Sequence, residues 1–306
     1  MAIADKLTKI ETDLTSAYNK ISQKGGTVPA NKNTNNLTNA INSIPEQPTF
    51  TSQGFANDSW ETIVAIADAG LAPEYYNIGD EKTISLSAVT DSTSWGKDIT
   101  AGTITVKIVS FNTTTLSNGD KGHITIMATI TSASSSAYDY DLFRHTLPYA
   151  TYSWAGAGAP KDWLNNTFKA SLPKKLRDNL KTQKHYFWNN YSFQMVSENK
   201  QIYIPNLYNL GIDNHNSFTG ADTNTSGGSY KILRDADVEK PFAYFTQYLK
   251  RYNTSDVMTN EYITTADTCT NWNFTYTRLK DIANQSGSIY VYGNSRAALF
   301  LPVFVI

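Results

Sequence analysis

Apolar side chains recur at alternating intervals of four and three positions through the first 24 residues of the chain. This stripe consists of Ile3, Leu7, Ile10, Leu14, Ala17 and Ile21. Most positions between them are Asp, Lys, Glu, Thr or Ser. Such a period, kept over about three repeats, is typical of a coiled-coil seam and predicts self-association, with a trimer as the expected state. The alternative is an amphipathic helix that packs within its own domain.

A boundary follows this helix. Gly25-Gly26 predicts its end, because glycine is common just beyond a helix C-terminus. Thr34 is expected to cap a second, short helix. The apolar residues of that helix are Leu37, Ile41 and Ile44. The prolines of segment 45–48 then predict the end of a helical module at residues 1–46, followed by a larger domain at residues 47–306.

The larger domain mixes helical and strand patterns. Residues 59–69 predict a helix, and residues 161–180 predict a helical stretch that Pro173 divides. Alternating apolar residues predict strands at 83–87, 103–111 and 123–130. An Asn-Gly turn within 117–122 predicts that the strands at 103–111 and 123–130 are antiparallel neighbours. Residues 297–306 are almost all apolar and predict a buried final strand. The expected fold class is therefore α+β, with antiparallel sheets and long loops.

Composition excludes several classes of protein. The 306 residues include 26 basic and 27 acidic side chains, a net charge of −1, whereas a nucleic-acid-binding domain shows a basic patch or stripe. No apolar run is long enough to span a membrane, and no signal peptide is recognisable at the start. The single cysteine, Cys269, excludes an internal disulfide and favours folding in a reducing cytosol. We therefore expect no nucleic-acid partner and no membrane insertion.

An ordered series of motifs resembles a known family. The segments 76–80, 161–165, 200–205, 240–245, 272–278 and 295–302 are similar, in that order, to the conserved segments of the DUF6273 domain. That family is common in gut Gram-positive bacteria and their prophages, and it is related to the formylglycine-generating-enzyme version of the C-type lectin fold. The resemblance covers about residues 75–306 and implies a C-type-lectin-like domain.

The first 45 residues resemble a second group of sequences. Their helix, ending in Lys24-Gly25-Gly26, and the segment Asn36–Pro45 look like the N-terminal leader of many phage tail and baseplate proteins of Gram-positive hosts. The resemblance implies a virion protein that is assembled in the host cytoplasm and acts outside after lysis. Its N-terminal helix would then bind other virion proteins or further copies of itself.

Three groups of aromatic and amide side chains are candidates for ligand binding. Tyrosine and tryptophan offer broad contact faces with a polar group, and asparagine can both donate to and accept from sugar hydroxyls. The first group is Tyr186, Trp188, Asn189, Asn190 and Tyr191. The second is Asp213, Asn214 and Asn216, and the third is Asn271, Asn273 and Tyr276. The alternative is that the aromatic residues are part of the core.

No constellation favours catalysis. Cys269 has no second cysteine to pair with, and the four histidines show neither metal nor triad spacing. Asp139 and Asp141 could share one face of a strand as a carboxylate pair, although a solvated loop is the simpler interpretation. The loop 213–226 could offer oxygens to Ca²⁺, but it has few carboxylates. We expect no enzyme activity, no cofactor and no resident metal.

These inferences together predict a phage virion adhesin of the tail-fibre or baseplate type. A trimeric N-terminal module would display several copies of a domain that contacts a host-surface glycan, polymer or protein, and linking weak sites raises avidity. Two alternatives stay open. One is a structural component, such as a head fibre or decoration protein, that binds only virion proteins. The other is a tail-borne hydrolase.

Overall fold

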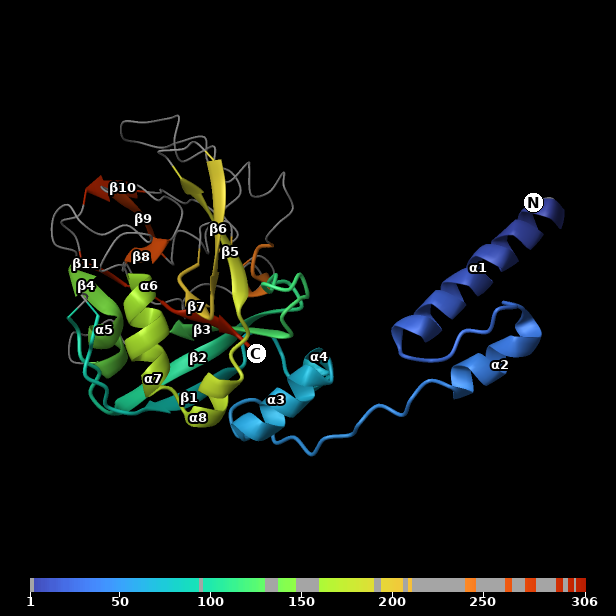
Figure 1. Cartoon of the computed structure of the whole chain (residues 1–306), viewed down its shortest axis with the longest axis horizontal. Helices are drawn as coiled ribbons and strands as arrows, with labels where there is room; N and C mark the ends of the chain where they lie inside the picture. Colours follow the sequence, from blue (N-terminus) through green and yellow to red (C-terminus); the bar gives the residue numbers. More distant parts are fainter. Residues whose placement is uncertain are drawn as a thin grey trace. The chain divides into compact units, whose positions relative to one another are not determined.

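The chain forms two compact units, Met1–Phe50 and Thr51–Ile306. A computed structural model describes residues 3–93, 96–129, 137–146, 160–189, 194–205, 209–210, 240–245, 262–265, 273–278, 290–293, 297–299 and 301–306 (Figure 1). Among them, no helix is both long and apolar enough to cross a membrane.

The smaller unit is a pair of packed helices, α1 (Ile3–Gln23) and α2 (Thr34–Asn42). Its buried core consists of Tyr18, Ile21 and Ala40, against which Leu14, Val28, Leu37 and Ile44 pack. The residues of the predicted apolar stripe are therefore divided between a buried surface and an exposed one. Its C-terminal members Leu14 and Ile21 face this core, whereas Ile3, Leu7 and Ile10 are 79%, 57% and 54% exposed.

Two glycines turn the chain between these helices. The N–H of Gly25, at φ 77°, donates to the carbonyl of Ser22, and the N–H of Gly26 donates to that of Ile21. This is the Schellman arrangement at a helix C-terminus. A Cβ on Gly26 would lie 2.6 Å from Ile21 Cγ2 and 2.9 Å from Ile44 Cγ1, so only glycine fits there without a shift.

The cap of α2 differs from the prediction. Asn33, rather than Thr34, is the N-cap, and its side chain accepts from the Asn36 N–H at 3.0 Å. Asparagine is at least as good an N-cap as threonine. The Asn33 carbonyl also accepts from the Tyr18 hydroxyl at 2.6 Å, so the start of α2 is tied to the middle of α1.

The larger unit is built on a five-stranded sheet of order β1-β2-β3-β12-β7. Its strands are β1 (Glu81–Leu86), β2 (Gly102–Phe111), β3 (Ile124–Thr129), β7 (Ile202–Tyr203) and β12 (Val303–Val305). All neighbours in this sheet are antiparallel, and the predicted pairing of β2 with β3 is confirmed.

A second five-stranded sheet has the order β10-β9-β8-β11-β4. Its strands are β4 (Arg144–Thr146), β8 (Tyr262–Thr265), β9 (Asn273–Arg278), β10 (Tyr290–Gly293) and β11 (Ala297–Leu299). The β5 (Gln183–Asn189) and β6 (Gln194–Lys200) strands form a separate antiparallel ribbon. The single final strand predicted at 297–306 is wrong: β11 and β12 lie in different sheets, with Pro302 between them.

Helices pack beside the main sheet, with α5 against β2 and η1 against β7. The described helices of the larger unit are α3 (Trp60–Asp68), α4 (Ala72–Tyr75), α5 (Tyr138–Phe143), α6 (Pro160–Trp163), the π-helical η1 (Leu164–Phe168), α7 (Lys169–Ser171) and α8 (Lys174–Asp178). The break at Pro173 and the helix after Ser59 agree with the prediction. The mixed α+β class is therefore observed (Figure 1).

The side-chain amide of Asn165 joins η1 to the edge strand β7. Its Nδ2 donates to the carbonyls of Lys161 at 2.8 Å and Ile202 at 2.7 Å. Its Oδ1 accepts from the N–H groups of Gln201 at 3.2 Å and Ile202 at 3.1 Å. A primary amide has two donors and two acceptor sites, so every one of them is used.

A buried carboxylate organises the start of the larger unit. Asp58 is 5% exposed and accepts from Ser52 Oγ at 2.5 Å, the Gln53 N–H at 2.6 Å and Tyr76 Oη at 2.8 Å. Burial by itself would raise the pKa of Asp58, but these hydrogen bonds and the charge of Lys82 outweigh it and hold that pKa below its ordinary value. Burial and the Asp58 carboxylate raise the pKa of Tyr76, which therefore stays a donor.

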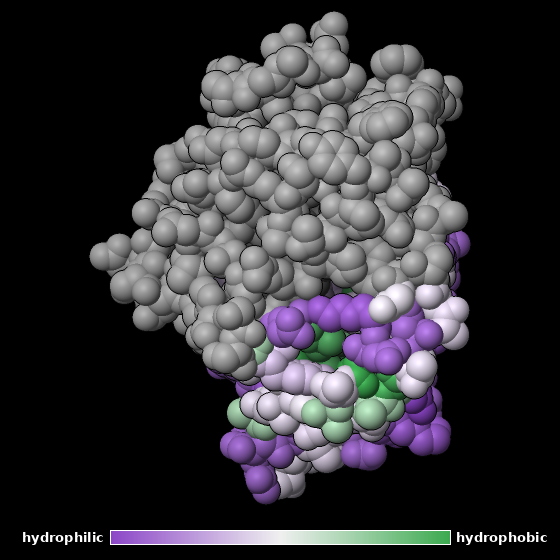
Figure 2. Space-filling model, turned by 90° about the vertical axis from the view of Figure 1, so that its left-hand side faces the viewer, coloured by the Kyte–Doolittle hydropathy of each residue, from purple (hydrophilic) through white to green (hydrophobic). Residues whose placement is uncertain are grey.

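Hydrophilic residues predominate among the described residues on the face shown in Figure 2, and hydrophobic ones are visible mainly within a hollow. This face of the molecule therefore shows no broad apolar patch among its described residues.

We expect Asn165→Ala to lower the free energy of unfolding by about 3 kcal/mol, because it leaves buried carbonyl and N–H groups of two elements without partners. Urea denaturation followed by circular dichroism measures this loss. Asn166→Ala is the matched control: its side chain is exposed, and its effect should stay within about 0.5 kcal/mol. Equal effects of the two substitutions would contradict the role assigned to Asn165.

The lowered pKa of Asp58 predicts a stability that depends on pH. A carboxyl with a depressed pKa in the folded state stabilises the fold above its unfolded pKa, and this contribution is lost as pH falls through the folded pKa. The unfolding free energy should therefore decrease as the pH is lowered below about 4.

In Asp58→Asn this decrease should be smaller, and stability at pH 7 should be about 2 kcal/mol lower. Denaturation series between pH 7 and pH 3 measure both effects. Glu74→Gln, at an exposed position, should keep the pH dependence of the unchanged protein. Parallel pH curves for the unchanged protein and Asp58→Asn would contradict the prediction.

Candidate functional site

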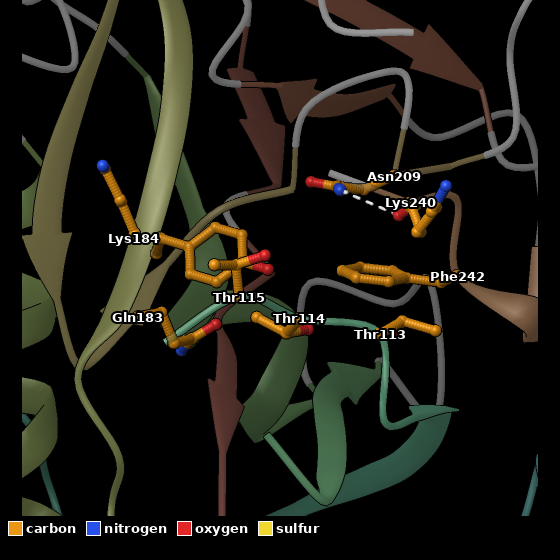
Figure 3. Close-up of a pocket in the computed structure, with 9 residues that line it drawn as sticks. Thr113, Thr114, Thr115, Gln183, Lys184, Asn209, Lys240 and Phe242 are labelled. Carbon is orange, nitrogen blue, oxygen red and sulfur yellow. Dashed lines mark hydrogen bonds between the residues drawn. The ribbon is translucent and has the colours of Figure 1, made fainter. Parts of the chain in front are cut away.

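A narrow pocket lies at the base of the β5–β6 ribbon (Figure 3). Gln183 and Lys184, from the start of β5, form one side, and Asn209, Lys240 and Phe242 lie opposite. The remaining lining residues are Thr113, Thr114, Thr115 and Tyr203. The cavity volume is about 10 Å³, enough for one water-sized group. Residues far apart in the sequence therefore meet around a space that admits one polar group.

Main-chain hydrogen bonds hold the two sides of this pocket in place. The N–H of Lys184 donates to the Thr115 carbonyl at 2.9 Å, and Leu116 forms an antiparallel bridge with Gln183. Across the pocket, the N–H of Phe242 donates to the Asn209 carbonyl at 2.7 Å. Asn209 Nδ2 also donates to the Lys240 carbonyl at 3.4 Å (Figure 3). The lining is thus positioned before any ligand arrives.

Gln183 differs from Asn165 in leaving half of its amide unused. It is fully buried, and its Nε2 donates to the Gln201 carbonyl at 3.0 Å. Its Oε1 has no hydrogen-bond partner among the described residues. An unsatisfied buried acceptor costs about 1–3 kcal/mol. This oxygen is therefore ready to accept from a ligand hydroxyl, a ligand N–H or a water molecule.

The surroundings of Gln183 combine aromatic rings with engaged hydroxyl groups. Tyr203 is 3% exposed and stacks on His185 with ring centroids 4.3 Å apart, and Phe242 is 1% exposed. The threonine hydroxyls have partners in Ser110, Thr125 and Lys121. The pocket therefore offers one acceptor between aromatic rings, and the ammonium groups of Lys184 and Lys240 point away from it (Figure 3).

The charged side chains near the pocket and elsewhere in the described chain are distributed as follows. The described residues that line the pocket include no Asp, Glu or Cys. Across the described part of the chain, no three or more His, Cys, Asp or Glu side chains gather as metal ligands. The carboxylate pair suggested by a strand at 139–141 is wrong, because these residues lie on α5. Asp139 is buried and Asp141 exposed, as expected for helix positions two residues apart.

The structure divides the predicted ligand-binding residues among separate elements. Tyr186, Trp188 and Asn189 lie on β5, whereas Asn273 and Tyr276 lie on β9 of another sheet. Tyr186 is half-buried, and Lys184 Nζ lies 5.5 Å from the centre of its ring. The remaining members lie outside the described residues: Asn190, Tyr191, Asp213, Asn214, Asn216 and Asn271. Cys269 and the loop considered for Ca²⁺ lie outside them too.

Sequence reasoning missed Gln183, Asn209 and Phe242 as members of one pocket. Gln183 lies three residues before Tyr186, the first member of the predicted aromatic and amide group, on the same strand β5. The sequence alone cannot distinguish a buried glutamine whose side-chain oxygen has no partner from a glutamine that is exposed to solvent. Its role follows from burial and from the long-range bridge to Leu116.

The motif residues 161–165 have structural roles. Lys161 Nζ lies 3.1 Å from Glu198 Oε1, and Trp163 Nε1 donates to the Lys97 carbonyl at 2.7 Å. Asn165 holds β7, as described above. Comparison of the chain with protein-family models, with curated proteins and with solved structures gave no match.

We expect Gln183→Met to change the unfolding free energy by less than about 1 kcal/mol, although the position is fully buried. The substitution removes a hydrogen bond to Gln201, but it also removes an unsatisfied buried oxygen, and these effects oppose each other. Urea denaturation measures the difference. Asn165→Ala is the contrasting variant. A loss from Gln183→Met as large as that from Asn165→Ala would mean that the Gln183 oxygen is satisfied within the fold.

Proposed function

We propose that this protein is a phage virion adhesin of the tail-fibre or baseplate type, with a C-type-lectin-like larger unit that contacts a host-surface glycan or polymer. The observation that carries the proposal is the pocket in which Gln183 Oε1 stands unpartnered among the described residues, near the rings of Tyr203 and Phe242. Apolar ring faces combined with hydrogen-bonding groups are common in ligand sites. The sequence motifs support the virion assignment.

A pocket that admits one polar group gives weak binding by itself. Several copies held together would bind much more tightly, because each later contact forms at high effective concentration. The exposed Ile3, Leu7 and Ile10 on α1 provide a surface for self-association, and a trimer is the proposed state. This surface is separate from the residues that pack against α2, so association does not require the smaller unit to open.

A structural role in the virion is the second candidate. The same exposed apolar residues of α1 could instead dock on another virion protein. A binding surface for virion proteins on the larger unit would be expected to show an exposed apolar patch. The described residues on the face in Figure 2 are mainly hydrophilic and show no such patch.

Leu7→Ser combined with Ile10→Ser should convert a trimer to a monomer, because both substitutions remove exposed apolar surface from the same stripe. Light scattering measures the mass of each variant. Binding to whole cells of candidate Gram-positive hosts should then require at least about a hundredfold higher concentration. The control is Glu11→Ser, an exposed residue of α1 outside the stripe.

Two results would contradict these proposals separately. An unchanged mass in the double variant would contradict the assignment of Ile3, Leu7 and Ile10 as the association surface. If the unchanged protein did not bind cells of hosts that the phage infects, the adhesin proposal would be contradicted and the structural role would stand. Gln183→Met should weaken cell binding while keeping both the mass and the fold, which separates the pocket from the association surface.

A further inference from the structure

An open hollow of about 420 Å³, which we call the α7 hollow, lies beside the π-helix η1. It shares no lining residue with the narrow pocket around Gln183, which we call the Gln183 pocket. One wall of the α7 hollow is the segment that follows β1, the other is η1 with α7, and α8 contributes one residue. Its lining residues are Val89, Thr90, Ser92, Asn165, Asn166, Thr167, Lys169, Ala170 and Arg177. The volume falls in the range of small-molecule sites.

Two cationic side chains line the α7 hollow, and two carboxylates lie close to it: Asp91, bound by Thr167, and Asp178, beside Arg177. Lys169 and Arg177 both line it, and its described lining includes no Asp or Glu. Arg177 Nη1 donates to the Ala170 carbonyl at 2.8 Å, and its Nε is 3.9 Å from Asp178. That carboxylate is also paired with Lys174. A guanidinium has five N–H donors, so Arg177 keeps donors beyond the one that holds it in place.

Neutral hydrogen-bonding groups share this lining with the two cations. Thr90, Ser92 and Asn166 are exposed at the hollow. A hydroxyl group donates one hydrogen bond and accepts two, and an amide does both. The hollow therefore combines cationic side chains that suit an anion with groups that suit hydroxyls.

The two walls are connected rigidly. The Asp91 carboxylate accepts from the N–H groups of Thr93 at 3.0 Å and Gly96 at 2.7 Å, and from the Thr167 hydroxyl across the hollow. The N–H of Ser87 also donates to the Ser171 carbonyl at 2.9 Å. These links fix the spacing of the walls before a ligand binds, which lowers the entropy cost of binding.

The π-helical turn is a second sign of a site at this place. The described backbone of residues 164–168 has the wider π-type turn, which is rare and frequently found at functional sites. One turn places Asn165 toward β7 and Thr167 toward Asp91, with Asn166 between them at the hollow.

We propose that the α7 hollow binds a phosphorylated polyhydroxy compound, of the size of a monosaccharide phosphate. The phosphate contacts Lys169 and the free donors of Arg177, since guanidinium and phosphate form strong charge-assisted hydrogen bonds. The hydroxyl groups contact Thr90, Ser92 and Asn166. The same chemistry is found in a free sugar phosphate and in a phosphate-containing polymer. This site does not depend on the Gln183 pocket or on the proposed adhesin function.

The test titrates the full chain by isothermal calorimetry with glucose 6-phosphate, glucose and inorganic phosphate. Glucose 6-phosphate should bind more tightly than either of the others, and its affinity should fall as salt is raised. Lys169→Gln should weaken this binding at least about fivefold. Lys24→Gln is the matched control, because Lys24 is exposed in the smaller unit and does not line the hollow.

Several results would overturn the proposal. One is the absence of saturable binding to the unchanged protein, and another is equal binding by Lys169→Gln and Lys24→Gln. If inorganic phosphate bound as tightly as glucose 6-phosphate, the proposed contacts with the sugar hydroxyls would contribute nothing to binding. Circular dichroism confirms that each variant is folded, and Gln183→Met should bind glucose 6-phosphate unchanged. A polymer of sugar phosphates that binds in the same Lys169-dependent way identifies the polymer as a source of the ligand.

Discussion

The saturated amide of Asn165 is the interaction on which the larger unit depends. An edge strand exposes unpaired main-chain groups, and the amide satisfies those of β7 as a further strand would. Through β7 it also supports β12, which pairs with β7 on one side and β3 on the other. The same residue fixes η1, whose Phe168 stacks on Trp163 of α6 in the core. One side chain thus joins the helical layer to the sheet.

Gln183 and Asn165 show opposite uses of the same chemical group. Asn165 uses all four of its hydrogen-bonding positions and contributes to stability. Gln183 is buried but keeps an oxygen without a described partner, which lowers stability and leaves an acceptor for a ligand. Asp58 resembles Asn165 in this respect, because its carboxylate oxygens accept hydrogen bonds from Ser52, Gln53 and Tyr76. The satisfaction of buried polar groups therefore separates positions that hold the fold from positions that can bind.

Local patterns in the sequence predicted the local structure well. The alternation at 103–111 and 123–130 gave two paired strands, and Pro173 divided two helices, because pleat and ring geometry act over a few residues. Long-range effects were not visible. Packing against α2 divides the α1 stripe, and the choice of sheet separates β11 from β12. The Gln183 pocket could not be predicted, since it is assembled from segments far apart in the chain.

The order of strands in the main sheet has a consequence for how the protein folds. β3 ends at Thr129, but its partner β12 begins only at Val303, so the middle of this sheet joins segments far apart in the sequence. During synthesis, the main-chain groups on this edge of β3 stay unpaired until residues 303–305 have been made. Such non-local pairing slows folding and leaves an exposed strand edge that can aggregate. Completion of the main sheet is therefore a late step.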